Sequence, residues 1–276
     1  MNVNQVSSLS RISNKNEACD FLRNTLKSAY PVAIWRLPNQ NKVHALIDLS
    51  LEECVMDSEL ESIDQSFIIN SYHDSHPTKA IVLKGHILIS ISENEAQSEL
   101  SPTLTDTQIE RFEKALNHTV LDTTHQLKDG NHPDFEHMVA DAVTKIKDGS
   151  LHKVVLSRYQ DFKLKESFDP ISTFIDLTET YANAFCHLTS TKSHGLWLGA
   201  SPEKLIAIES DQYFSTDALA GTQPLPAGKE LCDVAWTQKE IEEQAMVSRY
   251  IIDCFKKIRL REFDENGPKT IKAGNL

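Results

Sequence analysis

The stretch Leu196-Trp-Leu-Gly-Ala-Ser-Pro-Glu-Lys-Leu-Ile-Ala-Ile208 indicates the fold class of this chain. It holds two short apolar runs, Leu196–Ala200 and Lys204–Ile208, joined by the tight connection Ser201-Pro-Glu203. Short apolar runs separated by turn residues are typical of consecutive strands. A third run, from Tyr213 to Thr222, follows a further polar turn. We therefore predict an antiparallel meander in this part of the chain.

Helical patterns lie on both sides of these strands. Apolar residues recur at helical spacing from Phe135 to Ile146, and two further helices are predicted over Pro170–Tyr181 and about Lys239–Ile258. The apolar run Lys153–Arg158 is typical of a buried strand, and Thr270–Lys272 starts another strand near the last residue. The chain thus mixes helices and strands in its second half.

The first 130 residues or so have the pattern of a scaffold. Helices are predicted at the two ends of this region and short strands between them, with β-branched residues in the last strand. The predicted helices cover Asn16–Ala29 and Thr107–Val120, and the strands cover Val32–Leu37, Val43–Asp48 and His86–Ser92. We predict that residues 1–130 form a scaffold region of helices and strands that is distinct from residues 131–276.

Composition excludes several classes of protein. The chain has 276 residues, 40% hydrophobic and 25% charged, which is ordinary globular usage. Its 28 basic and 40 acidic residues give a net charge of −12, which disfavours nucleic acid and anionic membranes as partners. No apolar run is long enough to span a membrane, and the start lacks a signal-peptide pattern. Five cysteines without a CxxC spacing predict reduced thiols and a cytoplasmic protein.

Two side chains are candidates for acid–base chemistry. Lys153 heads an apolar run, where desolvation would lower its pKa and make it a general base. The alternative is a lysine at a strand edge whose ammonium reaches water. Glu203 lies in a tight connection, where an apolar environment would raise its pKa and make it a general acid. The alternative is a turn glutamate in solvent.

Two further segments are candidates for binding. Gly221 and Thr222 offer amide and hydroxyl donors that suit a carboxylate, although the same residues also fit a strand end before a turn. Glu240 and Glu243 are three residues apart on a predicted helix, so they share a face that could hold Mg²⁺. Glu240 also fits a capping box with Thr237, which makes Glu243 the preferred ligand.

The order and wording of five segments resemble the chorismate-binding enzymes. This family includes isochorismate synthases, salicylate synthases, anthranilate synthases and aminodeoxychorismate synthases. The resemblance covers about residues 130 to 276, and it implies that residues 1–130 are the family's variable N-terminal α/β region and that residues 131–276 begin the catalytic domain. It implies an α+β fold with large, mostly antiparallel sheets flanked by helices, like that of anthranilate synthase component I. The segments are His152–Arg158, Trp197–Glu203, Thr216–Thr222, Lys239–Val247 and Gly267–Leu276.

The resemblance also implies a role for each candidate. Lys153, which is glutamine in the ammonia-using branch, would activate water for attack at C2 of chorismate, and Glu203 would protonate the departing C4 hydroxyl. Ala220, Gly221 and Thr222 would line the site of the substrate carboxylate. Glu243, with Glu240, would hold Mg²⁺. At position 244 the family commonly has histidine, where this chain has glutamine.

The resemblance favours an isochorismate synthase of the menaquinone or siderophore type, with chorismate as substrate and without a glutaminase subunit. Salicylate synthase is the second reading, and a non-catalytic binding module of the same family is the third. The oligomeric state is left open. Because family members continue well past the last motif, we expect a chain truncated at its C-terminus, with part of the site missing and little or no turnover.

Overall fold

The computed structural model describes residues 9, 12–55, 63–70, 80–117, 134–208, 213–226, 228–272 and 276. The chain divides into two units, one formed by residues 1–120 together with 169–276 and the other by residues 121–168. The predicted boundary near residue 130 falls outside the described residues and stays a prediction.

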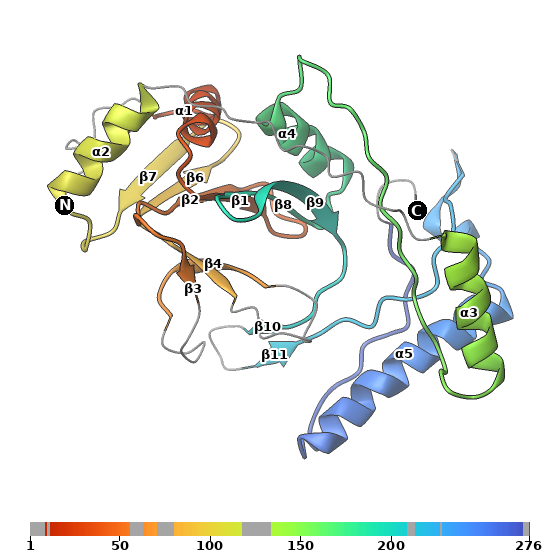
Figure 1. Ribbon diagram of the computed structural model, residues 1–276. Helices are drawn as coiled ribbons and strands as arrows, with labels where there is room; N and C mark the ends of the chain where they lie inside the picture. The colour runs from red at the N-terminus through yellow and green to blue at the C-terminus, as the bar shows by residue number, and fades with distance from the viewer. Residues whose placement is uncertain are drawn as a thin grey trace. The chain divides into compact units, whose positions relative to one another are not determined.

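A six-stranded antiparallel sheet forms the centre of the larger unit (Figure 1). Every neighbouring pair of strands in it is antiparallel. Together with the helices, this sheet confirms the predicted α+β class. In spatial order, its strands are β7 (Ala96–Leu100), β6 (Ile87–Ile91), β2 (Val43–Ile47), β1 (Val32–Arg36), β8 (Phe185–Thr191) and β9 (Gly195–Ser201).

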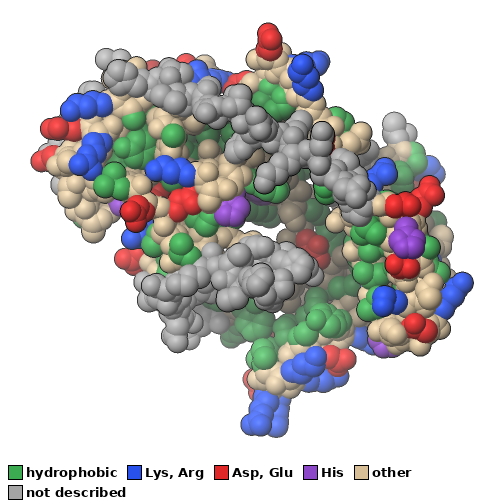
Figure 2. Space-filling view, viewed as in Figure 1, with side chains coloured by type: hydrophobic (Ala, Val, Ile, Leu, Met, Phe, Trp, Pro, Cys, Tyr) green, Lys and Arg blue, Asp and Glu red, His purple; other side chains and the backbone are tan. Residues whose placement is uncertain are grey.

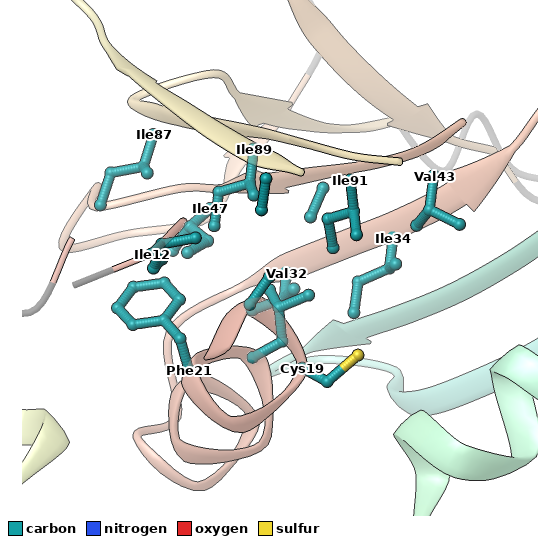
Figure 3. Packing of buried hydrophobic residues seen from close by; sticks show 14 of the residues in the cluster. Ile12, Cys19, Phe21, Val32, Ile34, Val43, Ile47, Ile87, Ile89 and Ile91 are labelled. Atoms are coloured by element: carbon teal, nitrogen blue, oxygen red, sulfur yellow. The ribbon is translucent and has the colours of Figure 1, made fainter. Parts of the chain in front are cut away.

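Helices cover one face of this sheet because apolar side chains alternate along its strands. Val32 and Ile34 of β1 point to the helices, and Ala33 between them points to the other face. The same core holds buried side chains of α1 (Lys15–Lys27), α2 (Asp106–Leu116) and α4 (Pro170–Thr180). Figure 3 shows isoleucines and valines of the strands packed against Phe21 and Cys19 of α1. These elements confirm the helices and strands predicted in the first half.

A small antiparallel sheet packs on the opposite face. Its strands, in spatial order, are β3 (Cys54–Val55), β5 (Ile81–Lys84) and β4 (Ser66–Ile69). Ile81 and Leu83 of β5 join Ala33 and Leu46 of the large sheet in a second buried cluster. The central strands are therefore buried on both faces, which explains their nearly continuous apolar sequences.

The predicted meander is formed only in part. Strand β9 pairs with β8, whereas β10 (Ala207–Ile208) pairs with β11 (Phe214–Ser215) in a separate two-stranded sheet. Pro202 lies between β9 and β10 and brings no N–H to a ladder, so the chain leaves the large sheet at this point. A short 3₁₀ helix, Leu231–Asp233, precedes the long helix α5 (Gln238–Lys257). The strand predicted at Thr270–Lys272 is not formed.

The smaller unit contains one described helix, α3 (Phe135–Lys147), as predicted. Asp134 accepts hydrogen bonds from the first turn of this helix, and the Arg158 guanidinium lies 5.5 Å from the centre of the Phe135 ring. The prediction of a buried strand over Lys153–Arg158 is wrong: the segment forms no ladder, and Val155 is 79% exposed. A strand needs a neighbour to receive its hydrogen bonds, and no described segment of this unit provides one.

The surface shows apolar side chains beside charged ones (Figure 2). Helix α5 has no buried residue, and Ile241 and Tyr250 are among its exposed large side chains. Lys256 and Lys257 occupy its last turn, where cations interact favourably with the helix dipole. Among the helices that the structure describes, none has the length and apolar character needed to cross a bilayer.

Candidate functional site

Glu203 follows strand β9 directly, as the sequence predicted. Strand β9 ends at Ser201, whose side-chain oxygen accepts a hydrogen bond from the Glu203 N–H at 3.3 Å. This bond turns the chain after Pro202, which cannot donate one itself. The Glu203 side chain is exposed. This exposure fits the turn reading, and an acid role would need a ligand that covers the carboxyl.

Lys204, the residue after Glu203, contacts the segment that leads into Ala218–Thr222. The Asp217 N–H donates to the Lys204 carbonyl oxygen at 3.3 Å. The Lys204 ammonium lies 3.7 Å from the Asp217 carboxylate and 3.4 Å from the Ser215 hydroxyl. Asp217 leads directly into Ala218–Thr222, so these contacts bring the Glu203 connection next to the predicted carboxylate-binding segment.

Helix α5 holds that segment from its other side. The side-chain amide of Gln244 makes two hydrogen bonds to it: its oxygen accepts from the Ala220 N–H at 2.9 Å, and its nitrogen donates to the Ala218 carbonyl oxygen at 2.8 Å. An amide side chain that both donates and accepts pairs with a backbone as a neighbouring strand would. The segment is thereby fixed to the helix that carries both predicted metal ligands.

Gly221 makes a close backbone approach to the same helix. Its φ is +74°, a left-handed conformation that side chains other than glycine rarely adopt. A Cβ atom built on Gly221 would lie 3.1 Å from both the Cβ and the carbonyl oxygen of Glu240. Glycine is therefore required here for two reasons, the backbone conformation and the close contact. The sequence analysis assigned Gly221 to a carboxylate site and did not predict its close approach to α5.

The two predicted metal carboxylates occupy different settings. Glu240 accepts hydrogen bonds from the Thr237 N–H, at 2.9 Å, and from the Thr237 hydroxyl, in the capping box expected as its alternative role. The Thr237 hydroxyl lowers the pKa of the Glu240 carboxyl from its ordinary value. Glu243 is half-buried one turn later on the same helix. The geometry thus assigns Glu240 to the helix start.

Lys153 belongs to the smaller unit, whereas the other predicted site residues belong to the larger one. Its side chain is half-buried, and the residues that follow it, Val154 and Val155, are exposed. The fold of the larger unit therefore gathers three of the four predicted motifs, those that contain Glu203, Gly221 and Glu243. The expected role of Lys153 stays a prediction.

A complete metal centre is not formed by the residues that the structure describes, since they contain no cluster of three His, Cys, Asp or Glu side chains. Mg²⁺ commonly takes only one or two protein carboxylates and completes its shell with water and substrate oxygens. A single carboxylate such as that of Glu243 fits this pattern, and Glu240 bonds to Thr237 in the cap. A magnesium ion shared between Glu243 and a bound anion is compatible with this arrangement.

Sequence reasoning missed the two contacts that assemble the site. The Lys204–Asp217 pair and the Gln244 clamp each join residues more than ten positions apart. Opposite charges at 204 and 217 were visible in the sequence, but nothing in the sequence gave their distance. Gln244 was noticed only because it differs from the common histidine.

Comparisons with known proteins identify the family of this chain. A family model described as chorismate binding enzyme matches residues 14–276. The isochorismate synthase MenF of Haemophilus influenzae is 30% identical over 92 residues, which are 33% of this chain and 21% of that protein. The chain therefore spans about a fifth of this curated relative.

A solved structure shows the same fold. The structure of MenF, the menaquinone-specific isochorismate synthase from Escherichia coli, matches with a TM-score of 0.51 and 12% sequence identity. The match covers 86% of this chain and 60% of that one. At this identity the likeness concerns the fold alone. Because the family model covers nearly all residues, this chain belongs to the chorismate-binding enzyme family.

Proposed function

We propose that this protein carries out isochorismate synthase chemistry: water adds at C2 of chorismate, and the C4 hydroxyl leaves. The main support is the family match over residues 14–276. The sequence likeness to the isochorismate synthase MenF of Haemophilus influenzae favours this branch of the family. Lys153 favours it too, because water needs a base whereas ammonia is already nucleophilic.

Each predicted residue has one step in the proposed mechanism. Lys153 in its neutral form takes a proton from water as the oxygen attacks C2. Glu203 in its protonated form gives a proton to the C4 hydroxyl, which leaves as water while the ring double bonds shift. One water is consumed and one is released, so chorismate and isochorismate are isomers. Both groups would act in the protonation state that burial under a ligand favours.

The remaining residues bind the dianionic substrate. Gly221 and Thr222 donate hydrogen bonds to a substrate carboxylate from the segment that α5 holds. Glu243 would hold Mg²⁺, which when bound neutralises the ring carboxylate. This matters because the chain has a net charge of −12 and would otherwise repel chorismate.

A product assay tests the proposed reaction. The purified protein, at micromolar concentration so that slow turnover is detected, is incubated with chorismate and Mg²⁺ and analysed by chromatography with mass detection. We expect only slow formation of isochorismate, in keeping with the low turnover predicted for this chain, with no salicylate or pyruvate and no dependence on added ammonia. Salicylate with pyruvate would establish the salicylate synthase alternative. If chorismate does not bind even at millimolar concentration, the proposal fails and a non-catalytic module remains.

The different settings of Glu240 and Glu243 allow a separate test of the metal proposal. We expect Glu243→Gln to weaken Mg²⁺ binding at least about 10-fold, measured by calorimetry with chorismate present, because a charged oxygen ligand is lost. Glu240→Gln is the matched control, since glutamine also serves in a capping box and should keep Mg²⁺ affinity within about 2-fold. Equal losses in both variants would assign the metal to both carboxylates, and no loss in either would refute the site.

A further inference from the structure

The hydrogen bonds of Ala218–Thr222 divide this segment into two parts. The Ala220 N–H and the Ala218 carbonyl oxygen are both bonded to the Gln244 side chain. Within the described part of the chain, the amides of Gly221 and Thr222 and the Thr222 hydroxyl donate to no protein group. One part of the segment is thus used for attachment, and the next two residues keep their donors.

The attachment fixes the direction of those donors. Two hydrogen bonds to one planar amide group restrict both the position and the rotation of the Ala218–Ala220 backbone. Gly221 comes next, and its backbone lies so near α5 that an added Cβ would be 3.1 Å from the Glu240 carbonyl oxygen. The Gln244 side chain is half-buried, so water competes with these bonds less than on an open surface.

We propose that Gln244 is a positioning residue for the substrate. Its amide clamps the backbone at Ala218 and Ala220, so that the Gly221 and Thr222 donors are held ready for a carboxylate of the ligand. The Ala220 N–H is excluded from substrate binding because Gln244 already occupies it. This inference rests on the proposed function, and it deepens that function by separating the residue that holds the binding segment from the residues that contact the substrate.

A glutamine suits this task better than most side chains of similar size. The clamp needs an acceptor for the Ala220 N–H and a donor for the Ala218 carbonyl oxygen. Glutamate offers only acceptors when ionised, and methionine has nearly the same shape but at most a weak acceptor. Gln244→Met therefore removes both bonds while filling the same space, and Gln244→Glu keeps the bond to Ala220 alone.

Amide hydrogen exchange tests the clamp without any substrate. In Gln244→Met we expect the Ala220 amide to exchange at least about 10-fold faster than in the native protein, because it loses its acceptor. Gln244→Glu should protect Ala220 nearly as well as glutamine. Gln238→Met, on the same helix, is the matched control, because Gln238 bonds to Glu242 and lies outside the segment. Circular dichroism verifies that α5 remains folded.

Chorismate binding tests the positioning role. We expect Gln244→Met to raise the chorismate Kd about 10-fold, with kcat changed less than 3-fold, because binding donors rather than reacting groups are disturbed. Gln238→Met should bind chorismate normally. Unchanged Ala220 exchange in Gln244→Met overturns the clamp. Faster exchange with an unchanged Kd overturns the positioning role. If the native protein binds no chorismate, the proposed function has failed, and the exchange data still decide the clamp.

Discussion

Replacing Lys153 with alanine, or Glu203 with glutamine, is expected to lower kcat for isochorismate formation at least about 100-fold. General acid–base catalysis by a positioned side chain typically contributes about 10²- to 10⁴-fold. Glutamine at 203 keeps the size of the side chain and removes only the proton that the C4 hydroxyl needs. Chorismate Kd should change less than 3-fold in both variants, because neither residue is assigned to substrate binding. Chromatographic product analysis gives the rates, and calorimetry gives the Kd.

Control variants separate this effect from a change in surface charge. Lys163→Ala removes an exposed lysine of the same unit as Lys153, and Glu262→Gln removes an exposed carboxylate of the same unit as Glu203. Both should retain the native rate within about 2-fold. Activity within 10-fold of native in both Lys153→Ala and Glu203→Gln would remove the acid–base assignment and favour a binding role for this chain.

Arg36→Met should lower the free energy of unfolding by about 3 kcal/mol. Arg36 is 3% exposed, and its guanidinium donates to the carbonyl oxygens of Ala182 at 2.7 Å and Tyr181 at 2.6 Å. It also donates to Leu37 and Thr178, so one side chain satisfies four carbonyls. Three of them lie at or just past the C-terminal end of α4, where carbonyls lack helical partners and attract a cation. Methionine would leave these carbonyls buried without a donor.

Urea unfolding monitored by circular dichroism measures this loss. Arg23→Met is the matched control: Arg23 bonds Asp169 at 2.9 Å and Asp20 at 2.8 Å, but about a third of its side chain is exposed. Arg23→Met should lower the free energy of unfolding by less than about 1 kcal/mol, because solvent screens exposed ion pairs. Arg36→Lys should fall between the two, since it keeps the charge but cannot reach several carbonyls at once. A loss below about 1 kcal/mol in Arg36→Met would contradict the capping role.

Local patterns were sufficient for several elements of the larger unit, although strands β3, β4, β5, β7 and β8 were not predicted. Val32–Arg36 and Val43–Ile47 form strands as predicted. Side chains of a strand point alternately to its two faces, so burial of one or both faces gives a recognisable pattern of apolar residues in the sequence. The capping box Thr237–Glu240 was also predicted from the residues themselves, since both bonds join positions three apart. These features need only near neighbours.

Patterns misled where a strand depends on a distant partner. The run Lys153–Arg158 has the composition of a buried strand, yet it pairs with no described segment. Lys204–Ile208 was expected to extend the sheet of β9, but only Ala207 and Ile208 form a strand, and they pair with β11. Strand pairing is a contact between segments, and no single segment records which partner will supply its hydrogen bonds.

The amino-acid sequence by itself determined the family, the antiparallel α+β class and the candidate residues, because these depend on residue type and local order. The tertiary structure decided which candidate segments contact one another. Asp217 pairs with Lys204, and Gln244 forms hydrogen bonds with the backbone of Ala218 and Ala220. The Glu240 carboxylate accepts a hydrogen bond from Thr237 at the start of α5. Each of the first two contacts spans more than ten residues of chain, so it exists only after folding has brought strand, loop and helix within hydrogen-bonding distance.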